Sequence, residues 1–381
     1  MRSPRWLATL VLLLLVGSMR SAAAAGIAVW VYDLPRWTEG QREAKLAALP
    51  PGTRHLYASV EDGPRFLLDD EFRAADIQRV VGDLRERPGI LTHAMILQDT
   101  RWLDDVEGAR ERLARVLALN RMRPDQAFAG VHVDVEPQTL EGWECGGIPE
   151  RRILVQKLQD LLGRLASAVP PAGKERSGRL LLSAALPWWI GALSTDIPEA
   201  SPRRFFESLD EIVLMAYGDP GGPRVGGSVQ ALLRRLEDAR LWRDVPPGKG
   251  IRIGLATYEY ASAADLLTTA RELDRAFDSQ KAYRGTAIFH STGNYGAPLS
   301  ASVRGLVQDA AGRPVARASV RVGERQTATN GCGRFVIRDL PTAGVALEVK
   351  ASGFQGVAVP VAGVTAGEEL EVAPIVLNRN P

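Results

Sequence analysis

The sequence of 381 residues predicts an α/β protein, a (β/α)8 TIM barrel followed by a small C-terminal all-β sandwich domain. Two observations lead to this fold class. Strand-like apolar runs alternate with helix-patterned segments eight times between residues 26 and 290. After residue 300 the sequence changes to short alternating runs that are separated by Gly, Pro, Asp and Asn. A hydrophobic content of 45% allows a sizeable core.

Residues 1–25 have the order of a secretory signal peptide: basic MRSPRW, the apolar run LATLVLLLLVG and small residues before Gly26. The apolar run is too short for a spanning helix. We therefore expect cleavage near Ala25 and a secreted or periplasmic protein. Removing the three arginines of this segment lowers the formal net charge from +2 to about −1, and nothing in the composition suggests a nucleic-acid binder. The excess of Arg over Lys suggests a bacterial source.

The predicted barrel domain covers residues 26–298, and the predicted sandwich covers 299–381. The eight strand-like runs are 26–33, 55–61, 91–99, 128–136, 179–187, 211–219, 251–260 and 283–290. Helical segments with apolar residues at three- and four-residue spacing lie between them, at 75–87, 104–122, 150–169, 228–241 and 264–277. A doubly wound open sheet is the alternative, but no glycine-rich phosphate loop follows a strand.

Polar and aromatic residues gather at the carboxyl ends of these strands, where a barrel builds its active site. They are Tyr32, Asp33, Glu61, Gln98, Asp99, Asp134, Glu136, Trp188, Trp189, Tyr217, Asp219, Tyr258, Glu259 and His290. Such a lining suits sugars, whose ring faces stack on aromatic rings while their hydroxyls bond to carboxylates. We expect core packing for Trp30 and Trp242. Trp143, Trp188 and Trp189 lie just past strand ends or in loops, and for them core packing and substrate contact both stay open.

The stretch GVHVDVEP, residues 130–137, places two carboxylates at the end of a valine-rich run. In a strand, His132, Asp134 and Glu136 share one face while the valines share the other. Two neighbouring carboxylates that point into a protein repel each other unless they are paired or used. The strand therefore predicts either an exposed end with paired acids or a functional carboxyl pair.

GVHVDVEP resembles the fourth-strand signature of glycoside hydrolase family 18, the chitinase-like barrels, whose pattern is Asp-Gly-x-Asp-x-Asp-x-Glu. Three further stretches follow in the family's order: LLLSAALP resembles its fifth strand, LMAYGD its sixth-strand Met-x-Tyr-Asp pattern and GTAIFH its eighth strand. The resemblance implies that Glu136 is the general acid, that Asp134 orients and stabilises the substrate's acetamido group and that Tyr217 donates a hydrogen bond to it. It further implies substrate contacts at Met215, Asp219 and Phe289. The aromatic residues Tyr32, Trp143, Trp188 and Tyr258, from strand ends and loops, are further candidates for contact with a polysaccharide or oligosaccharide.

This sequence departs from the family pattern at several positions. Ala129 and His132 stand where the family has its first two aspartates, and Phe289 replaces a tryptophan beneath the reacting sugar. His132 either donates to Asp134 or is a satisfied core histidine. HAMILQD occupies the place of a Ser-x-Gly-Gly pattern, and Gly218 moves Asp219 one residue later.

Two other functions stay open. A retaining glycosidase would use Glu136 as acid/base and Glu259 as nucleophile, although strand parity turns Tyr258 rather than Glu259 inward. A catalytically inactive, secreted carbohydrate-binding barrel would keep the aromatic lining and tolerate the missing aspartates.

The tail resembles the carboxypeptidase regulatory-like, transthyretin-type module through RGLVQDAAGRPVARASVRV (304–322) and GRFVIRDLP (333–341). We expect this module to serve in spacing, stabilisation or adhesion. The two cysteines, Cys145 and Cys332, fall in different predicted domains, so a disulfide is possible but not implied, and we expect both to be free or partly buried. No metal-ligand spacing appears, so the sequence predicts neither a metal nor another cofactor.

Overall fold

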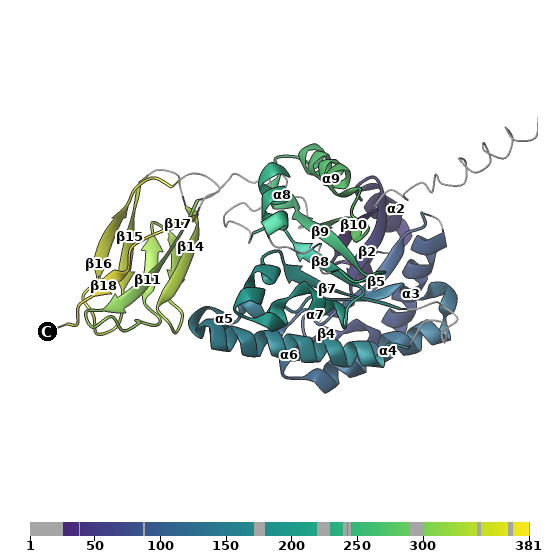
Figure 1. The fold of residues 1–381 in the computed structure, drawn as a ribbon, viewed down its shortest axis with the longest axis horizontal. Coiled ribbons are helices and arrows are strands. Elements are labelled where there is room, and N and C mark those ends of the chain that lie inside the picture. The colour runs from purple at the N-terminus through teal and green to yellow at the C-terminus, as the bar shows by residue number, and fades with distance from the viewer. Residues whose placement is uncertain are drawn as a thin grey trace, which may run out of the picture.

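The computed structural model describes residues 26–37, 39–86, 88–170, 180–218, 229–238, 242, 245–289, 301–340, 344–364 and 369–380. The expected signal peptide lies outside these residues. Figure 1 shows a barrel surrounded by helices, with a smaller β domain beside it that carries the C-terminus.

Eight parallel strands close into a barrel in the order β1-β10-β9-β8-β7-β6-β5-β2. The strands are β1 (Ile27–Val31), β2 (Thr53–Ser59), β5 (Leu91–Ile96), β6 (Gly130–Val133), β7 (Leu181–Pro187), β8 (Glu211–Met215), β9 (Gly250–Ala256) and β10 (Tyr283–Phe289). Each predicted apolar run overlaps one of these strands. The predicted (β/α)8 barrel is thus confirmed, and the open-sheet alternative is wrong. A small hairpin, β3 (Glu61–Asp62) and β4 (Arg65–Phe66), follows β2.

Helices cover the outside of the barrel. They are α2 (Glu39–Ala47), α3 (Glu71–Glu86), α4 (Val106–Met122), α5 (Glu141–Cys145), α6 (Gly147–Ala168), α7 (Pro202–Phe206), α8 (Val229–Asp238) and α9 (Ala263–Phe277). Side-chain caps fix two of the helix starts: Asp105 accepts from the Gly108 N–H at 3.0 Å, and Ser262 accepts from the Asp265 N–H at 3.2 Å. Leu, Val and Ile side chains from the helices and from the outer faces of the strands form one large core.

The inside of the barrel holds a second, smaller core and a buried polar network. Trp30, Tyr57, Met95, Val213 and Met215 are apolar or aromatic members of the inner core. At the amino-terminal end of β8 and β9, Arg252 pairs with Glu211 at 3.0 Å, and the Tyr57 hydroxyl donates to the same carboxylate at 2.7 Å. An ion pair and a phenol thus occupy this end of the barrel interior.

The C-terminal domain packs two four-stranded sheets over a core of its own. One sheet contains β11 (Ala301–Asp309), β14 (Arg334–Leu340), β17 (Glu369–Glu371) and β18 (Ile375–Leu377). The other contains β12 (Ser319–Val322), β13 (Arg325–Ala328), β15 (Val345–Lys350) and β16 (Val357–Val361). Val303, Val320, Phe335, Ile337 and Leu347 are buried between the sheets. The predicted all-β sandwich is confirmed.

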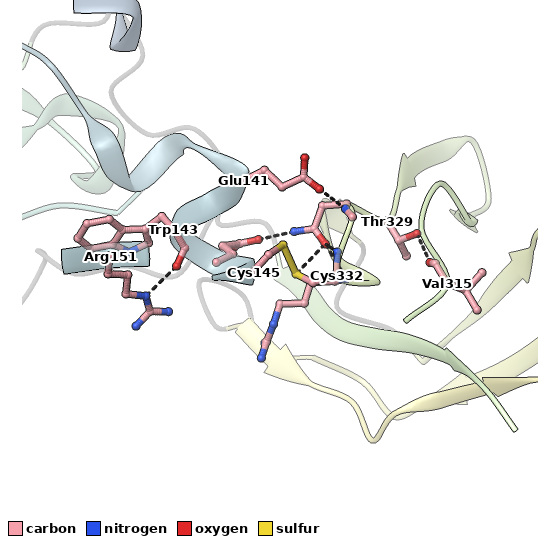
Figure 2. The surroundings of a disulfide bond; sticks show 11 residues. Glu141, Trp143, Cys145, Arg151, Val315, Thr329 and Cys332 are labelled. Carbon is pink, nitrogen blue, oxygen red and sulfur yellow. Dashed lines mark hydrogen bonds between the residues drawn. A yellow bond between two sulfur atoms is a disulfide. The ribbon is translucent and has the colours of Figure 1, made fainter. Parts of the chain in front are cut away.

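A disulfide bond between Cys145 and Cys332 joins the barrel to the sandwich, with 5.3 Å between the two Cα atoms (Figure 2). Cys145 ends α5, and Cys332 lies in the turn before β14. The expectation of free cysteines is wrong, because residues far apart in the sequence meet when the sandwich lies against α5. Within the described part of the chain, no helix has the length and apolar character needed to cross a membrane.

Candidate functional site

Asp134 and Glu136 lie just beyond the carboxyl end of β6, at the mouth of the barrel. β6 ends at Val133, but the alternation continues: Val135 is buried in the outer core, whereas Asp134 and Glu136 are half-buried and line a cleft of about 770 Å³. Pro137 begins a short 3-10 helix directly after Glu136. The two carboxyl groups therefore open into the same space, on the face expected from strand parity.

The other candidate residues come from several strand ends. Those that line the same cleft are Tyr32, Trp143, Trp188, Met215, Tyr217, Tyr258 and Phe289. Asp219 and His290 lie outside the described residues. Thus nine candidates that are scattered over more than 250 residues of sequence meet at one end of the barrel.

Aromatic rings form the floor of the cleft. Phe289 and Tyr217 stack with ring centroids 5.6 Å apart and planes inclined by 16°. Tyr32 and Tyr258 meet Phe289 edge-on, at 5.9 and 6.3 Å. Such a floor is an apolar platform with hydroxyls at its edge, which suits the face of a sugar ring.

Trp30 lies below this floor and also reaches the cleft. Its ring is T-shaped to Phe289 at 6.2 Å, and only 1% of the residue is exposed. The sequence predicts core packing for Trp30, and the structure places it in the inner core and at the base of the cleft. The parity of β1, which turns Ala28 and Trp30 to one side, is the signal that points to the second role.

Removal from water raises the pKa of Asp134 to about 6, and the negative charge of Glu61 adds to this effect. Glu61 begins β3, and its carboxylate accepts from the backbone N–H groups of Leu97 at 3.0 Å and Gln98 at 3.2 Å and pairs with Arg112. Asp134 is therefore a carboxyl group that changes charge close to neutral pH.

The two phenols nearest the carboxyl pair remain protonated. Burial raises the pKa of Tyr217 well above its ordinary value, and the charge of Asp134 is the next cause. Burial, followed by the charges of Asp134 and Glu136, also raises the pKa of Tyr32. Both phenols thus keep their protons and can donate hydrogen bonds in the cleft that the carboxyl pair lines.

His132 does not donate to Asp134, because both of its ring nitrogens bind elsewhere. The Trp30 indole N–H donates to Nε2 at 3.1 Å, and Nδ1 lies 2.9 Å from the Ser183 hydroxyl. An indole can only donate, so Nε2 accepts and the neutral ring carries its proton on Nδ1. Burial lowers the pKa of His132 to about 3, and its ring stacks on Tyr57 with centroids 4.0 Å apart. His132 is the core histidine of the two roles that the sequence left open.

Glu259 is turned away from the cleft and holds the loop after β8. It is 3% exposed, and its Oε1 accepts from the Gly218 N–H at 2.8 Å. The neighbouring Tyr258 hydroxyl donates to the Gly218 carbonyl at 2.5 Å and lines the cleft. Tyr258 and Glu259 thus anchor the backbone next to Tyr217. The inward position of Tyr258 agrees with the strand parity of the sequence.

A tryptophan wall stands on the side of the cleft that faces α5 and α6. Trp143 and Trp189 have centroids 5.6 Å apart, and the Arg151 guanidinium lies 5.8 Å from the Trp143 ring. Arg151 also donates from Nε to the Trp143 carbonyl at 2.7 Å, which fixes the position of both (Figure 2). Trp189, one of the strand-end residues singled out from the sequence, lines the cleft as well. Arg151 also lines it and was not a sequence candidate.

The remaining wall comes from the sandwich. Its contributions to the cleft are Arg304, Val336, Arg338 and Glu369. Sequence reasoning missed these residues, because it treated the second domain as separate from the site. The sequence does carry one signal for this wall, its two cysteines. Cys145 lies two residues after Trp143, so a disulfide to Cys332 would bring the sandwich next to the cleft.

Among the described residues, no group of three or more His, Cys, Asp or Glu side chains has the arrangement of a metal site.

Comparison with known proteins identifies the second domain. The sequence model of the carboxypeptidase regulatory-like domain matches residues 302–378, which confirms the resemblance of the tail to that module. No curated protein matches the sequence significantly.

Several solved structures match at low identity. The C-terminal domain of a candidate chitinase from Desulfitobacterium hafniense DCB-2 is 11% identical, with 92% of this chain and 93% of that chain covered and a TM-score of 0.39. Catalytic domain 2 of the Ostrinia furnacalis group II chitinase, a mutant in complex with penta-N-acetylchitooctaose, is 12% identical, with coverages of 61% and 64% and a TM-score of 0.36. A type II cohesin–X-dockerin complex from Acetivibrio cellulolyticus is 14% identical, with coverages of 20% and 56% and a TM-score of 0.18. The chain thus spans less than two thirds of the last two structures.

Proposed function

We propose that the protein is a secreted glycoside hydrolase that cleaves a glycan containing N-acetylhexosamine, with Glu136 as the general acid. The observation that carries the proposal is the meeting of Asp134, Glu136 and Tyr217 in one cleft above an aromatic floor. These are the residues to which the family 18 resemblance assigns the chemistry. The expected signal peptide supports a secreted or periplasmic location, where the substrate is an envelope or extracellular glycan.

In the first chemical step, Glu136 gives its proton to the glycosidic oxygen and the bond from that oxygen to the anomeric carbon breaks. The carbonyl oxygen of the substrate's own acetamido group forms a new bond to the anomeric carbon, which yields a cationic oxazolinium ring. Water then attacks the anomeric carbon, the bond from this carbon to the acetamido oxygen breaks, and the Glu136 carboxylate takes a proton from that water. The product has a free reducing end, and Glu136 returns to its acid form.

Asp134 and Tyr217 act on the acetamido group. In its ionised form, Asp134 accepts from the acetamido N–H and offsets the positive charge of the oxazolinium ring. The Tyr217 hydroxyl, which stays protonated, donates to the acetamido oxygen and holds it in line with the anomeric carbon. Phe289, stacked on Tyr217, supports the face of the reacting sugar.

The test measures new reducing ends released from chitin oligosaccharides and from neutral polysaccharides by the wild-type protein, Glu136→Gln and Glu259→Gln. We expect release from the N-acetylated substrate, a loss of at least about a hundredfold in Glu136→Gln, and near wild-type rates in Glu259→Gln. Glu259→Gln keeps an oxygen that can accept from Gly218, so it is a matched control. Inactivation by both substitutions, with both variants folded, would favour the two-glutamate mechanism instead.

A binding function without cleavage is the second candidate. It is favoured by His132, which is neutral and bonded to Trp30 and Ser183 where the family has an acid. The neutral His132 ring therefore offers Asp134 no charge with which to interact. Under this alternative, wild type and Glu136→Gln bind the same oligosaccharides equally well and neither releases reducing ends.

A further inference from the structure

The outer wall of the cleft is one face of a sheet in the second domain. Alternation in β14 sends Phe335 and Ile337 into the sandwich core, and Val336 and Arg338 to the outside. In the same sheet, Arg304 of β11 lies opposite Val336 of β14. The outer side chains therefore form a continuous surface across neighbouring strands, and this surface faces the barrel cleft.

Three links hold this surface in place, and all of them start from α5 (Figure 2). Cys145 forms the disulfide with Cys332. The Glu141 carboxylate accepts from the Gly331 N–H, and the Glu144 carboxylate accepts from the Asn330 side-chain amide at 2.7 Å. Because α5 also carries Trp143, the sandwich is tied to an element that lines the cleft.

The turn that receives these links is itself well braced. The Asn330 side-chain oxygen accepts from the backbone N–H groups of Cys332 at 3.2 Å and Arg334 at 2.9 Å. The buried Thr329 hydroxyl donates to the Val315 carbonyl at 2.7 Å and accepts from the Ala318 N–H at 2.8 Å. The links from α5 thus end on a rigid part of the sandwich, and they position its outer face.

The cleft continues outward along this face. A second cavity of about 300 Å³ lies between the domains and shares Glu144, Arg151, Arg304 and Val336 with the first. Space for a ligand therefore extends from the carboxyl pair, past the tryptophan wall, to the outer face of the sandwich. A single sugar unit at Glu136 leaves this outer part unfilled.

The charges of the outer part identify the kind of ligand. Its arginines are Arg151, Arg304, Arg334 and Arg338, and its acids are Glu144, Glu369 and Glu371. Arg304 pairs with both Glu369 and Glu371 at 3.3 Å while its side chain remains 46% exposed. Nearly balanced charges do not select an anion, but they offer donors and acceptors side by side, as neutral sugar hydroxyls require.

We propose that the outer face of the sandwich is a binding subsite for neutral sugar units of the glycan beyond the reacting one, with Arg304 and Arg338 as its hydrogen-bond donors. The inference rests on the proposed function, because it concerns the same cleft. It gives the carboxypeptidase regulatory-like domain a direct part in substrate recognition: the domain makes long glycans better ligands than short ones.

Calorimetric titration of the full-length Glu136→Gln protein tests the proposal, with GlcNAc disaccharide and GlcNAc hexasaccharide as probes. Adding Arg304→Gln and Arg338→Gln weakens hexasaccharide binding by about tenfold or more and disaccharide binding by less than about twofold. Arg321→Gln is the matched control: Arg321 lies on β12, is exposed and pairs with Glu348. It leaves both affinities as they are.

Two results would overturn the inference. If the two substitutions leave the hexasaccharide affinity unchanged, or weaken the binding of both probes equally, the proposed subsite is wrong while the proposed function stands. If neither oligosaccharide binds to any of these proteins, the proposed N-acetylhexosamine substrate itself is wrong, and the subsite for the same glycan falls with it. Circular dichroism of each variant separates loss of binding from loss of fold.

Discussion

The indole N–H of Trp30 donates to Nε2 of His132 over 3.1 Å, inside the barrel and close beneath the cleft. This bond requires a neutral histidine, because an imidazolium has no acceptor nitrogen. Aromatic and hydrogen-bonded residues thus lie beneath the carboxyl pair, where the family 18 pattern has further aspartates.

Acid should destabilise the protein through its buried histidines. Burial lowers the pKa of His55 to about 4, of His132 to about 3 and of His93 well below its usual value. Each ring therefore takes up a proton on unfolding below about pH 6.5, whereas Asp134, with its raised pKa, gives one up between about pH 6 and pH 4. The proton uptake by the three histidines exceeds the release from Asp134, so the free energy of unfolding falls as the pH decreases below 6, by about 1.4 kcal/mol per pH unit for each net proton.

Urea denaturation at several pH values between 5 and 8 measures this slope. We expect a constant free energy of unfolding above pH 7 and a decrease below pH 6. A free energy of unfolding that rises on acidification from pH 6 to pH 5 would contradict neutral buried histidines.

The activity should show an acid limb that belongs to Asp134. Because the ionised form acts on the substrate, kcat/KM should fall about tenfold per pH unit below about pH 6. Glu61→Gln removes the negative charge that helps to raise the pKa of Asp134, so the limb should move to lower pH. Glu107→Gln, an exposed substitution on α4, serves as the control. If the acid limb of kcat/KM lies at the same pH in folded Glu61→Gln as in the wild type, the limb does not belong to Asp134.

Gly254 is needed for the position of Tyr217. A Cβ atom at this position would lie 2.8 Å from the Leu214 carbonyl oxygen, 3.2 Å from the Tyr217 ring and 3.3 Å from the Trp30 ring. We expect Gly254→Ala to cost about 1–3 kcal/mol of stability and to lower kcat more than it raises KM. Gly163→Ala is the matched control, because it lies in α6 with only Ser208 Oγ near, at 3.8 Å, and should stabilise by about 0.5–1 kcal/mol. A wild-type kcat in Gly254→Ala would contradict this role, because it would show that the added methyl group does not displace Tyr217.

Removal of the disulfide should lower stability and loosen the cleft wall. The bond closes a loop with a sequence separation of 187 residues, so the double substitution Cys145→Ser and Cys332→Ser should cost about 2–5 kcal/mol. Thermal melting of this variant and of the reduced wild type should agree. If the reductant also lowers the melting temperature of the double variant, its effect on the wild type cannot be assigned to this disulfide.

The barrel could be predicted because its strands are local patterns. Each strand reads as an apolar run between polar ends, and the alternation in Val133, Asp134, Val135 and Glu136 persists beyond the hydrogen-bonded part of β6. The same local parity placed Tyr258 at the cleft and Glu259 away from it. Residues at the ends of barrel strands could be grouped because the fold brings all these ends together.

The second wall of the cleft could not be predicted in the same way. Arg304 and Arg338 reach the site through the docking of two domains, and no periodicity within either domain encodes that contact. The disulfide is similar: Cys145 and Cys332 meet because Glu141 and Glu144 bind the turn at Asn330. The partners of His132 also depend on tertiary packing, since Trp30 lies 102 residues away in the sequence.

The position of Cys332 in the chain sets the order of events during synthesis. All eight barrel strands, from Ile27 to Phe289, are made before this cysteine, so the bond to Cys145 can close only after the whole barrel has been translated. The sandwich must also reach α5 before the two sulfur atoms meet. The disulfide therefore forms only in chains whose two domains have assembled: a chain that stops before Cys332 keeps one thiol, and a complete chain that docks wrongly keeps two.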